Sequence, residues 1–332
     1  MAALSDPMAA APEVVELRQL SGRELDPTLL EETVEWQREL DWDFSRSADL
    51  VRQFADMRAL MGCALVDRGE VVGYGYSVLE EQRGLIGDLY VRPPWRNGAN
   101  EARLFRAILD GLIATPNLRR IESQLMLVDP PVGRALQRER PVRLQERMLM
   151  KLDTTKPPYL PAGAALRRFH IEPWADHHHE MAASVISLAY GEHVDSQINE
   201  QYRTAAGARR FLYNIVQFPG CGTFFRQGSF VAFDPLSGWM AGIVLVSFVA
   251  DDVGHITQLC VTPRVQGQGL GYELLREAIN ALRIHGARRI SLTVTRVNTE
   301  AIELYRRCGF QDVRRFLSYV WDGSGTAQDI DA

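Results

Sequence analysis

The stretch Val261-Thr-Pro-Arg-Val-Gln-Gly-Gln-Gly-Leu-Gly271 indicates the fold of this chain. The apolar run Ile256–Val261 predicts a buried strand, and Pro263 ends it. Beyond the stretch, apolar residues recur at helical spacing as far as Leu282. A strand that passes through a glycine-rich turn into a helix N-terminus presents converging N–H groups and a favourable dipole to an anion. The sequence therefore predicts a phosphate-binding loop at residues 266–271.

The spacing of the glycines narrows the choice of phosphate ligand. A nucleoside triphosphate loop needs Gly-Lys-Ser/Thr, which does not follow, and a dinucleotide fingerprint needs a third glycine where Tyr272 stands. The spacing that fits is Gln-x-x-Gly-x-Gly over residues 266–271, preceded by Val-x-Pro over residues 261–263. This pattern resembles the acetyl-CoA pyrophosphate loop of the GCN5-related N-acetyltransferase (GNAT) family.

A second block downstream carries the same resemblance. The alternation of apolar and polar residues from Ile290 to Thr295 predicts a half-buried strand. It is followed by Asn298-x-x-Ala-x-x-Leu-Tyr305-x-x-x-Gly-Phe310, which is similar to the last conserved helix of the family and its Gly-Phe turn. The resemblance covers roughly residues 164–322. It implies an α/β fold with a mixed, mostly antiparallel sheet flanked by helices.

The chain repeats itself on either side of a proline-rich segment, residues 154–163, which is a linker candidate. Val91-Arg-Pro93 corresponds to Val261-Thr-Pro263 at an offset of 170 residues, and Arg119-Arg-Ile121 to Arg288-Arg-Ile290 at an offset of 169. A nearly constant offset indicates a tandem duplication. We expect two GNAT-like domains, at residues 14–153 and 164–322.

The first copy departs from the pattern where the chemistry would be. Arg96, Ala99 and Glu101 stand in place of the loop's Gln-x-x-Gly-x-Gly residues, and Leu136 stands in place of Tyr305. A carboxylate at position 101 would repel a pyrophosphate. We interpret the first copy as a degenerate half that serves as scaffold or shapes the acceptor side of the second. This arrangement is also similar to the mycothiol synthases.

The resemblance implies acetyl-CoA as cosubstrate and a direct attack by the acceptor amine, which needs no metal and no nucleophilic side chain. In the family, the signature strand splays from its neighbour, so the backbones of Leu259 and Val261 would bind pantetheine. Tyr305 is the expected general acid for the leaving thiolate, unless its ring only packs under the cofactor. The expected cofactor-binding set is Leu259, Val261, Gln266, Gly267, Gln268, Gly269, Leu270, Gly271, Asn298 and Tyr305.

A general base is harder to place from sequence. His255 lies a few residues before the signature strand, where the family often has an acidic or polar group, and its ordinary pKa suits proton transfer near neutrality. An ordinary strand histidine fits the same position equally well. Asp251 and Asp252 are alternatives, although Asp-Asp-x-Gly is typical of a solvated turn. Weaker acceptor-side candidates lie in the segment that usually contacts the acceptor: Glu192, His193 and Asp195.

Two further groups have a structural interpretation. His177–His179 invites a metal assignment, but three consecutive residues of a helix point in different directions, so we expect no metal. Asp176 before them has the character of a helix N-cap. The aromatic residues Trp36, Trp42 and Phe44 are typical of a core or a cleft wall.

Composition restricts the remaining possibilities. The 332 residues carry a net charge of −5, which provides no basic footprint for nucleic acid. No apolar run approaches the roughly 18 residues of a membrane span, and the N-terminus lacks the charge pattern of a signal peptide. The cysteines show no paired spacing, which favours reduced thiols and a cytoplasmic protein. They are Cys63, Cys221, Cys260 and Cys308.

We therefore expect an N-acetyltransferase whose second copy moves an acetyl group from acetyl-CoA to a primary amine on a small molecule or peptide. The alternative from another class is a non-enzymatic acyl-CoA-binding sensor or protein-interaction module. Tyr305 favours the enzyme, because a pure binding protein needs no proton donor. Two copies in one chain are compatible with either a monomer or a homodimer.

Overall fold

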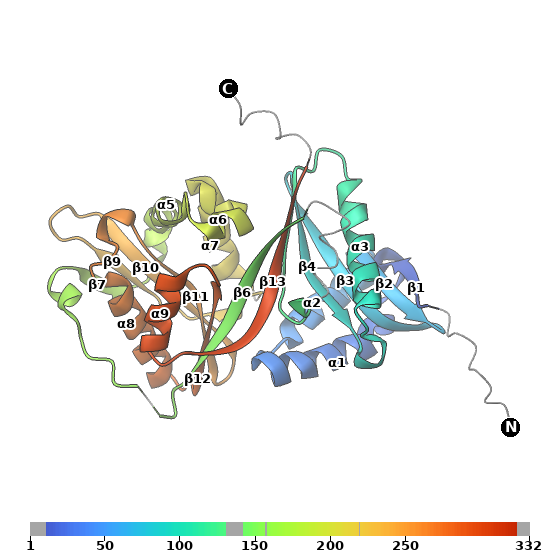
Figure 1. The fold of residues 1–332 in the computed structure, drawn as a ribbon, viewed down its shortest axis with the longest axis horizontal. Helices are drawn as coiled ribbons and strands as arrows, with labels where there is room; N and C mark the ends of the chain where they lie inside the picture. The colour runs from blue at the N-terminus through green and yellow to red at the C-terminus, as the bar shows by residue number, and fades with distance from the viewer. Residues whose placement is uncertain (1–10, 131–141, 157, 219, 324–332) are drawn as a thin grey trace. The chain divides into compact units, whose positions relative to one another are not determined.

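The structure is a computed structural model that describes residues 11–130, 142–156, 158–218 and 220–323 (Figure 1). The chain divides into two compact units. Unit 1 contains the chain up to Glu35, residues 48–144 and the chain from Tyr319 onward, and unit 2 contains residues 36–47 and 145–318. Both units have the α/β architecture predicted from sequence, a mixed and mostly antiparallel sheet flanked by helices.

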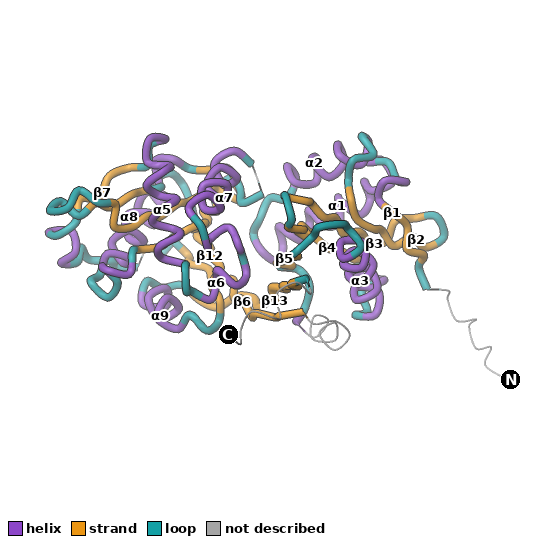
Figure 2. Tube along the Cα trace, turned by 90° about the horizontal axis from the view of Figure 1, so that it is seen from above, coloured by secondary structure: helices purple, strands orange, loops and turns teal. Residues whose placement is uncertain are grey.

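Unit 1 is built on the strand order β1-β2-β3-β4-β5, in which only the β4–β5 pair is parallel. Helix α3 packs against β2, β3 and β4 (Figure 2). The strands are β1 (Glu13–Glu16), β2 (Met61–Asp67), β3 (Glu70–Glu80), β4 (Arg83–Val91) and β5 (Arg120–Leu125). The helices are α1 (Gly22–Leu40), α2 (Ser45–Asp56) and α3 (Ala99–Ile113).

Unit 2 repeats this plan with the strand order β6-β12-β11-β10-β9-β7, and its β11–β12 pair is parallel. The strands are β6 (Val142–Asp153), β7 (His170–Pro173), β8 (Thr223–Phe224), β9 (Phe230–Phe233), β10 (Met240–Ala250), β11 (Val253–Val261), β12 (Arg289–Thr295) and β13 (Gln311–Asp322). The helices are α5 (His179–Tyr190), α6 (Val194–Ile198), α7 (Ala205–Gln217), α8 (Leu270–Ile284) and α9 (Thr299–Arg307).

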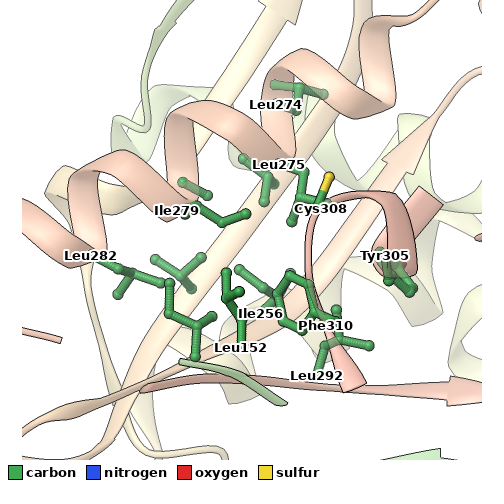
Figure 3. Packing of buried hydrophobic residues seen from close by; sticks show 14 of the residues in the cluster. Leu152, Ile256, Leu274, Leu275, Ile279, Leu282, Leu292, Tyr305, Cys308 and Phe310 are labelled. Carbon is green, nitrogen blue, oxygen red and sulfur yellow. The ribbon is translucent and has the colours of Figure 1, made fainter. Parts of the chain in front are cut away.

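Strand β10 shows how the sequence covers both faces of the unit 2 sheet. Its residues are apolar at successive positions, so alternate side chains enter two different cores. Val244 and Val246 join the cluster made with α8 and α9, which Figure 3 shows from close by. Ile243 and Leu245 join the cluster made with α5 and α7. The sheet is therefore buried on both sides, and polar side chains between the layers need partners.

The sequence predicts a hairpin in each copy, Gly62–Val66 with Val71–Leu79 and Ser229–Phe233 with Trp239–Val249. Both hairpins are confirmed, because β2 pairs with β3 and β9 with β10, both antiparallel. The sequence also predicts an opening strand in each copy, at Val14–Leu20 and at Leu166–Glu172, and the strands found there, β1 and β7, are shorter. Residues Leu17–Gln19 and Ala164–Arg167 form 3-10 turns instead. Each turn buries one apolar side chain, Leu17 in the first and Ala165 in the second. In a regular strand, successive side chains would instead point alternately to the two faces of the sheet.

The two copies exchange segments relative to their order in the sequence. Strands β6 and β13 each contribute residues to both units, and residues 36–47 of the first copy belong to unit 2. A sequence repeat shows where each copy begins and ends along the chain, but it does not predict which sheet each strand joins. Leu136 of the first copy lies outside the described residues. Within the described residues, no helix is long and apolar enough to cross a membrane.

Unit 1 buries a set of carboxylates against tyrosines of its sheet. Glu32 on α1 accepts a hydrogen bond from the Tyr74 hydroxyl at 2.6 Å, and Glu35 accepts one from the Tyr90 hydroxyl at 3.0 Å. Asp88, 5% exposed, accepts from the Leu89 N–H at 2.7 Å. Burial is the main cause that raises the pKa of the Asp88 carboxyl above its usual value.

Asp88→Asn tests this burial. A carboxyl whose folded pKa is raised contributes most stability at low pH and loses it as the pH rises through the folded value. Asparagine keeps the acceptor for the Leu89 N–H without the charge. We expect a higher melting temperature at pH 8 and a smaller gain at pH 5, measured by calorimetry. Asp49→Asn removes an exposed carboxylate paired with Arg52 and should change neither value appreciably. A gain that does not depend on pH would contradict the interpretation.

Candidate active site

The parallel strands β11 and β12 separate along half of their length. They are paired from Val253–Ile256 with Arg289–Leu292. Beyond that point β11 stays paired with β10 as far as Val261, and β12 stays paired with β6 as far as Thr295. A register shift in the β10–β11 pair follows Leu245, which bends the strand away from its neighbour. The β12-facing edge of residues 257–261 is therefore open.

The glycine-rich loop continues from the open end of β11 into helix α8. Gly267 and Gly269 have φ of 74° and 83°, which side chains rarely adopt, and Gly269 is the N-cap of α8. A Cβ added at Gly271 would meet only Leu304 Cδ2 at 4.0 Å, so a ligand has room at this position. The first N–H groups of a helix have no partner within the helix. The loop thus has a backbone shape that suits an anion, and phosphate binding at residues 266–271 stays a prediction.

The other expected loop residues contribute in part through their own packing. Leu270 is 1% exposed and belongs to the core under α8. Gln268 donates from Nε2 to the Arg264 carbonyl at 3.0 Å, which stabilises the turn. Gln266 and Gly267 are exposed on the rim. An anion at residues 266–271 would therefore be bound by backbone N–H groups rather than by side chains.

The equivalent helix in unit 1 is closed by its own side chains. The Gly98 N–H donates to Glu101 at 3.1 Å, and the Asn100 N–H donates to the Asn97 side chain at 2.9 Å. These caps satisfy N–H groups that an anion would need. The strand opening is nevertheless present, because β4 is paired with β5 only from Arg83 to Ile86 and continues to Val91.

Helix α9 brings the two remaining expected residues to the open end. The Asn298 side chain accepts from the Ala301 N–H at 3.3 Å, so it is the N-cap of α9, and its Nδ2 lies 3.1 Å from His193 Nε2. Tyr305 is 9% exposed, and burial raises the pKa of its hydroxyl above its usual value. The phenol stays protonated over the physiological range and can donate a hydrogen bond.

Tyr190 is a site residue that the sequence did not reveal. Its hydroxyl donates to the Leu259 carbonyl at 3.2 Å, on the open stretch of β11. Its ring stacks on Tyr202 at 4.8 Å and meets His193 edge-on at 5.2 Å. In the sequence Tyr190 is one more residue of an apolar helix, and no local pattern distinguishes it.

His255 lies in the paired half of β11 rather than at the open end. Its Nδ1 is 2.8 Å from the Ser291 hydroxyl, and its ring is 5.0 Å from that of Trp42. Burial, assisted by the positive charge of Arg147, lowers the pKa of the imidazole to about 4. A neutral, weakly basic imidazole fits a hydrogen-bonding role better than removal of a proton from an ammonium group.

The alternative residues fall into two groups. Asp252 lies in the β10–β11 turn, where its carbonyl accepts the Arg288 N–H at 2.8 Å, at the end of β11 opposite the loop. Glu192 is exposed. His193 and Asp195, in contrast, lie at the open end: the Thr295 hydroxyl donates to the Asp195 carboxylate, and His193 contacts Asn298.

The histidine run forms a cap with an acidic neighbour. His178 Nδ1 accepts the Ala175 N–H at 3.0 Å, and its Nε2 lies 3.0 Å from Glu172. The ligand atoms of Glu172, His177 and His178 lie within 4.8 Å of one another. Because Nδ1 accepts a hydrogen bond, the proton of the neutral ring is on Nε2, directed at Glu172, where a metal would have to bind. Asp176 lies inside the 3-10 turn Asp176–His178, and Ala175 is its N-cap, because the His178 ring makes the capping bond.

Comparison with known proteins finds similarity to one family over part of the chain. Residues 197–310 match the acetyltransferase (GNAT) family. Over 102 residues the chain is 33% identical to the mycothiol acetyltransferase of Mycolicibacterium gilvum, covering 29% of this chain and 34% of that protein. It is 38% identical over 74 residues to a putative ribosomal protein bS18-alanine N-acetyltransferase of Bacillus subtilis, covering 22% and 48%. The chain thus spans less than half of the length of these relatives.

Solved structures extend the likeness to the whole chain at the level of fold. A GCN5-related N-acetyltransferase from Sphaerobacter thermophilus superposes with a TM-score of 0.65 at 16% identity, covering 96% of this chain and 97% of that one. A tandem GNAT protein from the clavulanic acid biosynthesis pathway gives 0.56 at 17% identity, covering 93% and 98%. The split strands and glycine loop define a GNAT fold. Residues 197–310 thus match the GNAT family, and the chain as a whole has the fold of tandem GNAT proteins.

His255→Asn tests the buried neutral imidazole. A histidine whose folded pKa is depressed contributes stability above its unfolded value near 6.5 and loses it as the pH falls toward 4. At pH 5 the loss is about 2 kcal/mol relative to pH 8. We expect the variant to lose less unfolding free energy than wild type between pH 8 and pH 5, by chemical denaturation. His285→Asn, at an exposed position, should follow wild type. Equal acid sensitivity of all three proteins would refute the assignment.

Proposed function

We propose that unit 2 transfers an acetyl group from acetyl-CoA to a primary amine. The observation that carries the proposal is the coincidence of an open β11 edge with an uncapped, glycine-lined helix N-terminus at its end. A pyrophosphate would bind N–H groups of the loop over residues 266–271 other than those of Gln266 and Gln268, which donate to the Pro263 and Val265 carbonyls. The pantetheine arm would pair with the backbone of Leu259 and Val261, replacing the Tyr190 hydroxyl at the Leu259 carbonyl.

The chemistry follows from the groups at the open end. The amine, after loss of its ammonium proton to water or to Asp195, attacks the thioester carbonyl, so that a C–N bond forms and the C–S bond breaks. The open N–H groups of β11 would stabilise the oxyanion. Tyr305 would donate its proton to the leaving sulfur and regain one from the amide nitrogen through solvent. The products are the N-acetyl amine, CoA and one proton.

The remaining expected residues receive supporting roles in this proposal. Asn298 caps α9 and would hydrogen-bond the cofactor with its amide, which already lies beside His193. His255, proposed from sequence as a base, would act as a neutral hydrogen-bonding group behind the acceptor. Unit 1 would bind no acetyl-CoA, because Glu101 closes its helix N-terminus. We expect one cofactor site in each chain.

Gly271→Glu tests the cofactor site without backbone strain, since Gly271 does not have a positive φ. A carboxylate at this position would face the pyrophosphate. We expect acetyl-CoA affinity to fall at least tenfold by calorimetric titration, with one site per chain in wild type. Gly111→Glu makes the same change on α3, where a Cβ meets nothing within 4 Å, and should bind as wild type does. Undiminished binding by Gly271→Glu would place the cofactor elsewhere.

Tyr305→Phe separates the enzyme from a binding module. Loss of a positioned general acid costs about 10²-fold or more in rate. We expect kcat to fall by that order and the acetyl-CoA dissociation constant to stay within about threefold, measured by thiol release over an amine panel. Tyr319→Phe removes a buried hydroxyl in unit 1 and controls for stability. Tight 1:1 binding with no turnover of any amine by wild type would favour the sensor.

A further inference from the structure

His193 is held at the open end of the unit 2 sheet by contacts on three sides. Its ring meets the ring of Tyr190, whose hydroxyl donates to the Leu259 carbonyl, edge-on at 5.2 Å. Its Nδ1 accepts the Asp195 N–H at 3.1 Å, which makes the ring the N-cap of α6. Its Nε2 lies 3.1 Å from Nδ2 of Asn298, at the start of α9. The His193 side chain is 29% exposed, so a ligand can reach it.

The helix cap fixes the position of the proton on the His193 ring. A backbone N–H can only donate, so Nδ1 is the unprotonated nitrogen and Nε2 carries the proton. A proton on Nδ1 would face the Asp195 N–H and break the cap. It would gain no bond in return, because the Asp195 carboxylate is 3.8 Å from Nδ1, beyond hydrogen-bond distance. Nε2, the nitrogen nearer to Asn298, is therefore a donor.

Asn298 faces that donor with a donor of its own. Its Oδ1 accepts the Ala301 N–H at 3.3 Å as the N-cap of α9, which orients its Nδ2 toward His193. The flipped amide would give His193 an acceptor but would leave the Ala301 N–H facing an NH2 group. Two N–H groups 3.1 Å apart do not bond each other. Both are satisfied when one oxygen atom accepts from the two of them.

This donor pair, Nε2–H of His193 and Nδ2–H of Asn298, borders the path of the proposed ligands. A ligand that pairs with the Leu259 carbonyl replaces the Tyr190 hydroxyl there, and the Tyr190 ring contacts the His193 ring. Solvent oxygen can accept from the donor pair in the free protein at a cost in entropy, so a ligand oxygen that replaces it gains affinity.

We propose that His193 and Asn298 together bind one carbonyl or carboxylate oxygen of a ligand in unit 2, which makes His193 a binding residue rather than a base. This inference rests on the proposed function, which supplies two sources of such an oxygen: the pantetheine arm of acetyl-CoA and the amine acceptor. The chemistry of the site is the same for both sources, and binding measurements distinguish them.

Asn298→Asp tests the donor pair in the free protein. Aspartate keeps an oxygen for the Ala301 N–H and gives the His193 Nε2–H a charged acceptor. We expect the melting temperature of the free protein to rise by about 2–4 °C in calorimetry, because a hydrogen bond to a charged group replaces two facing donors. A carboxylate at a helix N-cap also stabilises through the helix dipole, so the gain needs a control.

His193→Asn provides that control through a double-mutant cycle. Asparagine is a good N-cap and keeps an acceptor for the Asp195 N–H, but it is too short to donate to position 298. In this background we expect Asn298→Asp to lose most of its stabilising effect. An equal gain in both backgrounds, or a lower melting temperature of Asn298→Asp in the wild-type background, would refute the donor pair. Neither measurement needs a ligand.

Titrations then locate the ligand oxygen. His193→Asn removes one of the two donors and should weaken binding by about 2- to 10-fold, and Asn298→Asp, which turns a donor into a carboxylate, by at least tenfold. If the oxygen is on the pantetheine arm, acetyl-CoA affinity falls while affinity for adenosine bisphosphate, which has the nucleotide without that arm, stays unchanged. If it is on the acceptor, KM for the amine rises and acetyl-CoA affinity stays unchanged.

The results separate this inference from the proposed function. A more stable Asn298→Asp variant that binds acetyl-CoA or the amine less tightly supports the site, because a purely structural role would move stability and affinity in the same direction. Acetyl-CoA binding and amine KM that both stay at wild-type values in the two variants refute the site and leave the acetyltransferase standing. Absence of acetyl-CoA binding by wild type refutes the proposed function and this ligand assignment together.

Discussion

The parallel pairing of β11 with β12 stops after four residue pairs, and the site depends on that early end. A parallel pair that continued to Val261 would use both edges of β11 and leave no backbone groups for a ligand. The neighbours make the separation possible. Strand β10 holds one side of the opening and β6 holds the other, so each separated strand still has one paired edge. The opening is therefore stable without any ligand.

The two copies share the short parallel strand pairing but differ in how the N-terminus of the following helix is capped. Unit 1 keeps the same short parallel pairing but satisfies the start of α3 with Glu101 and Asn97. Unit 2 leaves the start of α8 to glycines. Side-chain capping stabilises a helix by about 1 kcal/mol. The first copy therefore has a more stable helix N-terminus and no free N–H groups for an anion there, with the same fold. The second copy forgoes that stabilisation at Gly269.

The glycine loop, the hairpins and the fold class were predictable because each depends on residues close in sequence. Gly267 and Gly269 lie in the turn before the helix that their spacing indicated, and both have a positive φ. Arg147 and Trp42 were not predictable as neighbours of the site, since both enter unit 2 from the first copy through pairings distant in sequence. His255 was identified as a residue of interest, but sequence could not show that its environment holds it neutral.

The contribution of β13 to both units bears on the order in which the protein can form during synthesis. Residues from Tyr319 onward belong to unit 1, and Asp322 pairs there with Arg120. Unit 1 therefore still has a vacant strand position while the second copy is being translated, and β13, which follows the rest of the second copy, fills it. The first copy in the sequence is completed only after the second has been translated. Removal of the final residues of β13 would damage the copy that lies farthest from them in sequence.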